Sequence, residues 1–222
     1  MDEKGKIFVV IPAFNEAAVI EKTISDVKKY YQNVVVVDDG STDETADSAR
    51  AGGGDILKHI INRGQGAALR SGIDYALDKG AEIIITFDAD GQFEPEEMRR
   101  LCAPIEKDEC DIVLGSRFLT KNSVPFLRRL LLKGAILLTR AITGLDLTDA
   151  HNGFRALSRK AAEKIVIRQD RMAHASDILH EIARLKLRYR EVPVAVKYTA
   201  YSRKKGQKLS GAGRILFDII FK

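Results

Sequence analysis

Cysteine is scarce in this sequence, which has two such residues, Cys102 and Cys110, in a chain of 222. Their spacing offers neither a C-x-x-C pair nor a second set of thiol ligands, so we expect no disulfide framework and no zinc site. Uncharged apolar runs of about 18 residues are also missing, and a membrane-spanning helix requires such a run. We therefore expect a globular protein with free thiols in a reducing cytosol.

Aromatic residues are few as well, at 7% of the chain, and they are not interleaved with basic residues in a recognisable RNA- or DNA-binding motif. We therefore expect no nucleic-acid partner. The opening residues, MDEKGKIFVV, are acidic and lead straight into an apolar strand, which is not the pattern of a secretory signal. The length, with 45% apolar and 30% charged residues, is typical of an α/β protein with a sizeable core.

Charge is distributed unevenly along the chain. Residues 1–120 contain 14 Lys and Arg against 23 Asp and Glu, whereas residues 121–222 contain 22 against 8. An acidic half followed by a strongly basic half predicts an anionic partner for the second half. A membrane surface and a phosphorylated substrate both fit that prediction.

Apolar runs alternate with helical patterns through the first half. Strands are predicted in KIFVVIP, NVVVVDD, DILKHII, EIIITFD and CDIVLGS, and helices lie between them, with Ser41 or Thr42 as the cap of the helix after the second strand. Strands that are apolar throughout are buried on both faces, so the sequence predicts a mostly parallel sheet covered by helices. In the second half we expect helices at 124–144 and 174–189 and a strand at 191–200.

Polar motifs follow the predicted strands at their carboxyl ends. They are Asn15-Glu16, Asp38-Asp39, Asp88-Ala89-Asp90 and Ser116-Arg117. Because the carboxyl ends of parallel strands meet at one edge of the sheet, we expect these side chains to form one ligand site. The histidines, including His59 within the predicted third strand, offer no ligand spacing and no role.

Asp88 and Asp90 stand one residue apart at the end of a buried strand. Both carboxylates can reach one divalent cation as the backbone turns, and Gln92 can add an amide oxygen. Hard cations such as Mg²⁺ or Mn²⁺ take oxygen ligands and keep positions open for substrate phosphates. A capped and solvated turn explains the same residues, so the pair alone leaves both interpretations open.

The helix at 124–144 is apolar and basic. Arg129, Lys133 and Arg140 fall on one side of it, and leucines fill the remainder. Together with the apolar tail ILFDIIF, this pattern fits contact with an anionic membrane surface. A core helix or a dimer interface is the alternative, and the sequence leaves the oligomeric state open.

The motifs in combination resemble a known family. VVIPAFNE, VVVVDDGSTDET, NRGQGAALRSG, FDADGQFEPEE, GSRF and DAHNGFRALSR occur in the order and approximate spacing of family 2 glycosyltransferases. The chain is most similar to the dolichyl-phosphate mannose synthase and polyprenyl-phosphate glycosyltransferase branch, and the similarity extends to the loop YSRKKGQKL. It implies a GT-A fold, in which a Rossmann-like, mostly parallel sheet with flanking helices is joined to a C-terminal amphipathic, basic region.

The resemblance also implies roles for individual residues. Residues 1–222 would form one domain, with 1–120 binding the nucleotide sugar and 121–222 binding the acceptor and the membrane interface. The implied nucleotide-sugar site is Pro12, Asn15, Glu16, Asp39, Arg63 and Asp88; the metal site for Mg²⁺ or Mn²⁺ is Asp88, Asp90 and Gln92; the catalytic set is Asp90, Arg117 and Asp149; and the acceptor phosphate site is Arg128, Arg203 and Lys208.

The implied activity is inverting transfer of a hexose from a nucleotide sugar to a polyprenyl or dolichyl phosphate. The protein would then act as a peripheral protein on the cytoplasmic face of a membrane. An acceptor phosphate is already anionic and needs positioning more than a base. If the acceptor is instead a glycan or another hydroxyl compound, a base is required, and Asp149 is the first candidate. The motifs fit uridine and guanosine donors alike.

Overall fold

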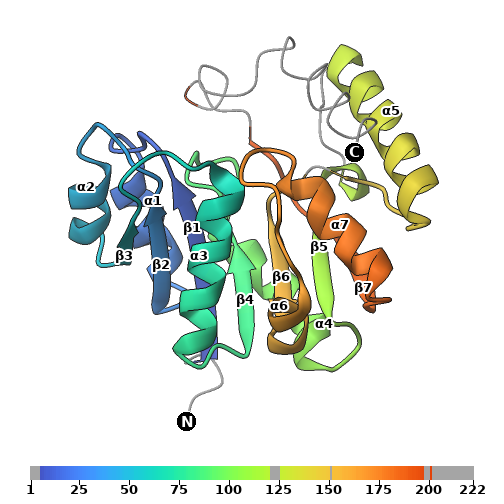
Figure 1. Ribbon diagram of the computed structural model, residues 1–222, viewed down its shortest axis with the longest axis horizontal. Helices are drawn as coiled ribbons and strands as arrows, with labels where there is room; N and C mark the ends of the chain where they lie inside the picture. Colours follow the sequence, from blue (N-terminus) through green and yellow to red (C-terminus); the bar gives the residue numbers. More distant parts are fainter. Residues whose placement is uncertain (1–5, 121–125, 151, 198–200, 202–222) are drawn as a thin grey trace.

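The computed structural model describes residues 6–120, 126–150, 152–197 and 201 (Figure 1). Its strands are β1 (Ile7–Ala13), β2 (Asn33–Asp38), β3 (Asp55–Lys58), β4 (Ile83–Thr86), β5 (Ile112–Ser116), β6 (Arg155–Ser158) and β7 (Tyr189–Pro193). The helices are α1 (Ile20–Lys28), α2 (Thr45–Ala51), α3 (Gln65–Asp78), α4 (Met98–Glu106), α5 (Phe126–Thr143), α6 (Arg159–Lys164) and α7 (His174–Arg184), with short 3₁₀ turns η2 (Pro95–Glu97) and η3 (Arg117–Leu119).

The strands form one seven-stranded sheet in the order β3-β2-β1-β4-β6-β5-β7. β6 is antiparallel to both β4 and β5, and every other neighbouring pair is parallel. The predicted mostly parallel sheet is therefore confirmed. Because β6 runs in the opposite direction, the residues that precede it reach the same edge as the carboxyl ends of the parallel strands, and this brings residues 149–150 and 152–154 to that edge.

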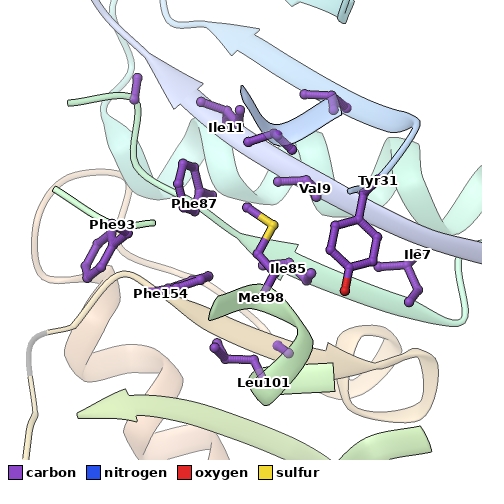
Figure 2. Packing of buried hydrophobic residues seen from close by; sticks show 14 of the residues in the cluster. Ile7, Val9, Ile11, Tyr31, Ile85, Phe87, Phe93, Met98, Leu101 and Phe154 are labelled. Carbon is purple, nitrogen blue, oxygen red and sulfur yellow. The ribbon is translucent and has the colours of Figure 1, made fainter. Parts of the chain in front are cut away.

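Helices cover both faces of the sheet (Figure 1). Side chains alternate along β1, so that Ile7, Val9 and Ile11 join one core while Phe8 and Val10 join the other. The first core lies under α1, α2 and α4 and contains the aromatic rings shown in Figure 2. The second lies under α3, α5, α6 and α7. These two layers hold the sheet rigid, and the loops at its edge are mounted on it.

Several sequence predictions need correction. Ser41 and Thr42 do not cap α2, which begins at Thr45 after Glu44 with no side-chain cap; instead the backbone N–H of Asn15 donates to Ser41 Oγ. The strand predicted at 191–200 is observed as β7 at Tyr189–Pro193. It ends at Pro193 because its partner β5 ends at Ser116. His59 follows β3 instead of lying within it.

Other predictions agree with the fold. Both cysteines are free and buried. The helix predicted at 124–144 is α5. None of the helices in the described ranges combines the length and apolarity that crossing a bilayer requires.

Candidate active site

Three aromatic rings fix the backbone on either side of the Asp88–Gln92 turn. Phe87 and Phe93 flank the turn, and both pack against Phe154, with ring centroids 5.3 Å and 5.0 Å from that of Phe154 (Figure 2). All three rings are buried in the apolar core, so the two ends of the turn are anchored there. The carboxylates between them are therefore presented from a rigid base, beside the residues that lead into β6.

Asp88 is partly buried at the edge of the sheet. Burial raises the pKa of its carboxyl, while the nearby Arg155 guanidinium and a 2.9 Å hydrogen bond from Gln65 Nε2 to Oδ1 oppose that shift. Gly153 lies directly against it, since a Cβ on Gly153 would stand 2.5 Å from Asp88 Oδ2. Any larger residue at position 153 would therefore displace this carboxylate.

Asp90, two residues further on, is a second carboxyl with a raised pKa. Burial, the Asp88 charge and the Glu16 charge together raise its pKa to about 7. The backbone N–H of Gln92 donates to Asp90 Oδ1 over 3.1 Å, and Gly91 supplies the positive φ of +69° that this tight turn needs. The Asp-Ala-Asp segment is thus both a capped turn and a pair of adjacent carboxyls whose ionisation the surroundings disfavour.

The donor groups of this edge fit Mg²⁺ or Mn²⁺ bound together with a substrate. Among the described residues, no group of three or more His, Cys, Asp or Glu side chains is arranged to hold a metal ion by itself. Mg²⁺ commonly uses only one or two protein carboxylates and takes its other ligands from water and substrate phosphates. Asp88 and Asp90 match that requirement, and a cation between them would favour the ionised carboxylates against the burial that raises their pKa values.

The loops after β1 and β2 are joined by hydrogen bonds. Asn15, at a positive φ of 54°, receives the backbone N–H of Thr42 on its Oδ1 over 2.9 Å, and the N–H of Glu16 donates to Thr45 Oγ1 over 2.8 Å. Pro12 is buried in β1 opposite Val37. The Asn-Glu pair that sequence reasoning placed at the site is therefore held in place by the loop that follows Asp38 and Asp39.

Glu16 also contacts the start of the basic C-terminal segment. The Tyr201 hydroxyl donates to Glu16 Oε2 over 2.6 Å, and burial followed by this hydrogen bond raises the pKa of Tyr201. The charges of Asp43 and Asp90 act in the same direction, so Tyr201 lies among the acidic groups of the edge. Residue 201 brings the chain to the site immediately before the segment that contains Arg203 and Lys208.

Asp39 is the centre of a second cluster. Its Oδ1 accepts from the backbone N–H of Arg63 over 3.0 Å and lies 2.7 Å from His59 Nδ1, and its Oδ2 accepts from the N–H of Gly64 over 2.6 Å. The other ring nitrogen of His59 lies 3.0 Å from Ser71 Oγ on α3. Because a carboxylate only accepts, Nδ1 carries the proton and Nε2 accepts from Ser71 in neutral His59.

Asp149 and Arg117 form a buried ion pair on the other side of the edge. Arg117 Nε and its backbone N–H donate to Asp149 Oδ2 over 2.6 Å and 3.1 Å. Glu191 on β7 supports the pair by accepting the backbone N–H groups of Thr148 and Asp149. Burial is the main cause that raises the pKa of Glu191, against the lowering effect of those amides.

Arg155 lies between the two groups of carboxylates and is fully buried. Its Nη1 has no hydrogen-bond partner, and burial lowers its pKa to about 10 in spite of the Asp88 and Asp149 charges. The guanidinium of Arg155 therefore places a positive charge close to both Asp88 and Asp149. Arg155 therefore links the cluster of Asp88 electrostatically to that of Asp149.

Most of the predicted site residues meet at this one edge. Those the structure places there are Pro12, Asn15, Glu16, Asp39, Arg63, Asp88, Asp90, Gln92, Arg117 and Asp149. Arg203, Lys208 and the side chain of Arg128 lie outside the described residues. Sequence reasoning missed Arg155, Glu191 and His59. The G-F-R motif that follows Asp149 contained a signal for Arg155, whereas nothing in the local sequence marks His59 or Glu191 as a partner of a distant aspartate.

Comparisons with known proteins identify the family. The profile described as "Glycosyl transferase family 2" matches residues 8–166. An uncharacterised protein of Methanocaldococcus jannaschii is 39% identical, with 99% of this chain and 93% of that protein aligned. The UDP-N-acetylglucosamine–dolichyl-phosphate N-acetylglucosaminyltransferase of Methanococcus voltae is 30% identical, with 96% and 94% aligned.

A solved structure with the same arrangement of sheet and helices is glucosyl-3-phosphoglycerate synthase from Mycobacterium tuberculosis in complex with Mn²⁺ and UDP-glucose. Its TM-score is 0.75 at 22% identity, and 97% of this chain and 76% of that chain are aligned. Since the family profile matches well over half of the residues, the chain belongs to glycosyltransferase family 2 and has the GT-A fold.

Proposed function

We propose that the protein is an inverting, metal-dependent hexosyltransferase that moves a sugar from a nucleoside diphosphate sugar to a polyprenyl or dolichyl phosphate. The observation that carries this proposal is the pair Asp88 and Asp90, two neighbouring carboxyls at the end of β4 whose pKa values are raised by burial and, at Asp90, also by the Asp88 charge. Two relatives support it by their names: one transfers N-acetylglucosamine to dolichyl phosphate, and the other was solved with Mn²⁺ and UDP-glucose.

On the donor side, Asp88, Asp90 and Gln92 would hold Mg²⁺ or Mn²⁺ against the diphosphate. The bound cation would neutralise the charge that develops on the departing nucleoside diphosphate. Asn15 and Glu16 would shape the nucleotide pocket, with Glu16 near the ribose and Pro12 beneath it. Asp39 would accept from the base, next to Arg63.

On the acceptor side, cationic groups would position a phosphate whose oxygen attacks the anomeric carbon. Arg117 and Arg155 are buried at this edge, and Arg128, Arg203 and Lys208 are proposed to complete the phosphate site. The alternative, in which Asp149 acts as a base toward a hydroxyl acceptor, is less consistent with the geometry. Asp149 is buried, and its Oδ2 is already engaged by two N–H groups of Arg117.

Contact with a membrane surface is proposed for α5. Leu130 and Leu137 are 60% and 66% exposed there, and Arg129 and Lys133 are exposed on the same helix. Arg140 is different, because it donates to Leu147 O and pairs with Asp146 within the protein. An apolar helix surface with exposed cations suits an anionic lipid surface, and peripheral binding at the cytoplasmic face follows from the proposed acceptor.

The test is a screen of radiolabelled nucleotide sugars with purified polyprenyl phosphate, with and without Mn²⁺. We expect sugar in the organic phase with one donor, dependent on Mn²⁺ and reduced at least about 1,000-fold by Asp90→Asn. Asp78→Asn is the matched control, because Asp78 is exposed at the last residue of α3.

Two results would contradict the proposal. Transfer to a soluble hydroxyl acceptor, with no lipid product, would assign the enzyme to the alternative acceptor class. Full activity of Asp90→Asn in Mn²⁺ would remove the metal role of the β4 carboxylates.

A further inference from the structure

The Asp39 cluster has more hydrogen bonds than a capped turn requires. Asp39 is 3% exposed, and three N–H groups converge on its carboxylate from the segment 59–64. None of these groups comes from the turn that directly follows β2. The hydrogen bonds therefore fix the orientation of the carboxylate plane, and they also determine which of its lone pairs remain available to a ligand.

The available lone pairs can be counted. An ionised carboxylate offers about four acceptor positions, two on each oxygen. Oδ1 uses both of its positions, on His59 Nδ1 and the N–H of Arg63, while Oδ2 uses one, on the N–H of Gly64. One acceptor position remains, and it is on Oδ2.

The nucleobases differ in how many hydrogen-bond donors they present to this carboxylate. Guanine presents two adjacent donors, N1–H and N2–H, which pair with both oxygens of a free carboxylate. Uracil presents a single donor, N3–H, between two carbonyl oxygens. A guanine at Asp39 would leave one buried donor without a partner, and such a loss is costly.

The surroundings of Asp39 also suit a base with flanking carbonyls. An open cavity of about 470 Å³ is lined by Lys58, His59, Ile60, Ile61 and Arg63. Asp39 does not itself line this cavity, but His59 and Arg63 both hydrogen-bond to it. Ile60 and Ile61 offer apolar surface to a planar base, and Lys58 and Arg63 offer donors to its carbonyl groups.

We infer that the donor is a uridine diphosphate sugar, and that His59 determines this choice by occupying the second acceptor position of Asp39 Oδ1. This inference rests on the proposed function, in which Asp39 accepts from the base. His59 acts as a positioning residue through Asp39, and Ser71 fixes its ring by donating to Nε2.

Two substitutions of His59 separate its hydrogen bond to Asp39 from its contact with Ser71. Asparagine places its amide nitrogen near the position of Nδ1, so His59→Asn keeps the hydrogen bond to Asp39. Glutamine places its amide nitrogen near the position of Nε2, so His59→Gln keeps the contact with Ser71 and releases Asp39 Oδ1. His180→Gln is the control, because His180 is exposed on α7 and its side chain makes no hydrogen bond to the other described residues.

The experiment is titration calorimetry of UDP and GDP in Mn²⁺ with the full chain. We expect the wild type, His59→Asn and His180→Gln to prefer UDP by at least about 100-fold. In His59→Gln the preference should fall at least about tenfold, and GDP should bind more tightly in absolute terms than it does to the wild type. A merely loosened pocket would weaken both nucleotides equally.

The outcomes separate the inference from the proposed function. A wild type that binds GDP as tightly as UDP would overturn the uridine assignment and leave the transferase intact. An unchanged ratio in His59→Gln would overturn the role of His59. Binding of neither nucleotide would contradict the proposed function, and the inference with it.

Discussion

Two sets of carboxylates lie at the same edge of the sheet, and the protein treats them differently. Asp88 and Asp90, after β4, are partly buried next to each other and near Glu16, and their pKa values are raised. Asp149, before β6, is more deeply buried, and two N–H groups of Arg117 engage one of its oxygens. The two sets therefore differ in burial and in how the protein pairs them: Arg117 donates hydrogen bonds to Asp149, whereas Arg155 acts on Asp88 through its charge.

This difference indicates which carboxylates bind a ligand and which have a structural role. A buried carboxylate with a cationic partner contributes to a defined local structure, and removing either member leaves the other uncompensated. A buried carboxylate next to other carboxylates is destabilising until an external cation arrives. On this basis the Asp149–Arg117 pair shapes the site, and the Asp88–Asp90 pair receives the metal and the diphosphate.

The largest expected effect breaks the paired side. Asp149→Asn should destabilise the metal-free protein by about 3 kcal/mol, because it leaves the Arg117 guanidinium buried without its anion. Urea unfolding monitored by circular dichroism measures this change. A destabilisation below about 0.5 kcal/mol, the size of an ordinary surface substitution, would show that the pair has no structural role.

The same chemical change should have the opposite sign on the unpaired side. A carboxyl whose folded pKa is about 7, against 3.8 ordinarily, binds protons more tightly when folded, so its ionisation costs stability as pH rises from about 4 to about 7. Asp90→Asn should therefore stabilise the metal-free protein at pH 8 by about 1–2 kcal/mol, and the gain should vanish near pH 4. Unfolding at both pH values, in a chelator, checks it. Equal destabilisation by Asp90→Asn and Asp149→Asn would remove the distinction between the two sets.

A smaller effect is expected at Glu191. Its substitution weakens the support of the Asp149 backbone but leaves the Asp149–Arg117 ion pair in place. Glutamine keeps one acceptor oxygen and turns an N–H₂ group toward the amides of Thr148 and Asp149. Glu191→Gln should cost about 1 kcal/mol of stability. Transfer should fall about tenfold while Mn²⁺ affinity is retained, and a loss of Mn²⁺ affinity would show that the two sets are not separate.

The smallest effect concerns the exposed surface of α5. Leu137→Asp should weaken binding to vesicles that contain anionic lipid by about tenfold, because one exposed leucine is removed from the lipid contact. Vesicle cosedimentation measures it, and Tyr30→Asp on the α1 side serves as the control. Equal binding of the two variants would argue that α5 contacts another protein surface instead.

The sequence predicted the sheet and most of the site because both depend on local patterns. Continuous apolar runs identified β1, β2, β4 and β5, and the polar residues directly after them were necessarily at one edge. The antiparallel insertion of β6 between β4 and β5 depends on packing between distant residues, so no local pattern indicated it.

The missed residues have the same explanation. Glu191 is 42 residues from Asp149, and His59 is 20 residues from Asp39, so their hydrogen bonds exist only in the folded chain. Arg155 is the first residue of β6. The antiparallel pairing of β6 with β4 places its positive charge between Asp88 and Asp149. Sequence spacing named the carboxylates, and the fold determined which of them have partners.

The most direct test of the central claim is whether Mn²⁺ and a nucleoside diphosphate bind cooperatively through the β4 carboxylates alone. Calorimetric titration of UDP would be carried out with and without Mn²⁺ on the wild type, Asp90→Asn and Glu191→Gln. We expect Mn²⁺ to tighten UDP binding at least about tenfold in the wild type and in Glu191→Gln, and to have no effect in Asp90→Asn. Retained cooperativity in Asp90→Asn would contradict the account, because the cation would then bind elsewhere.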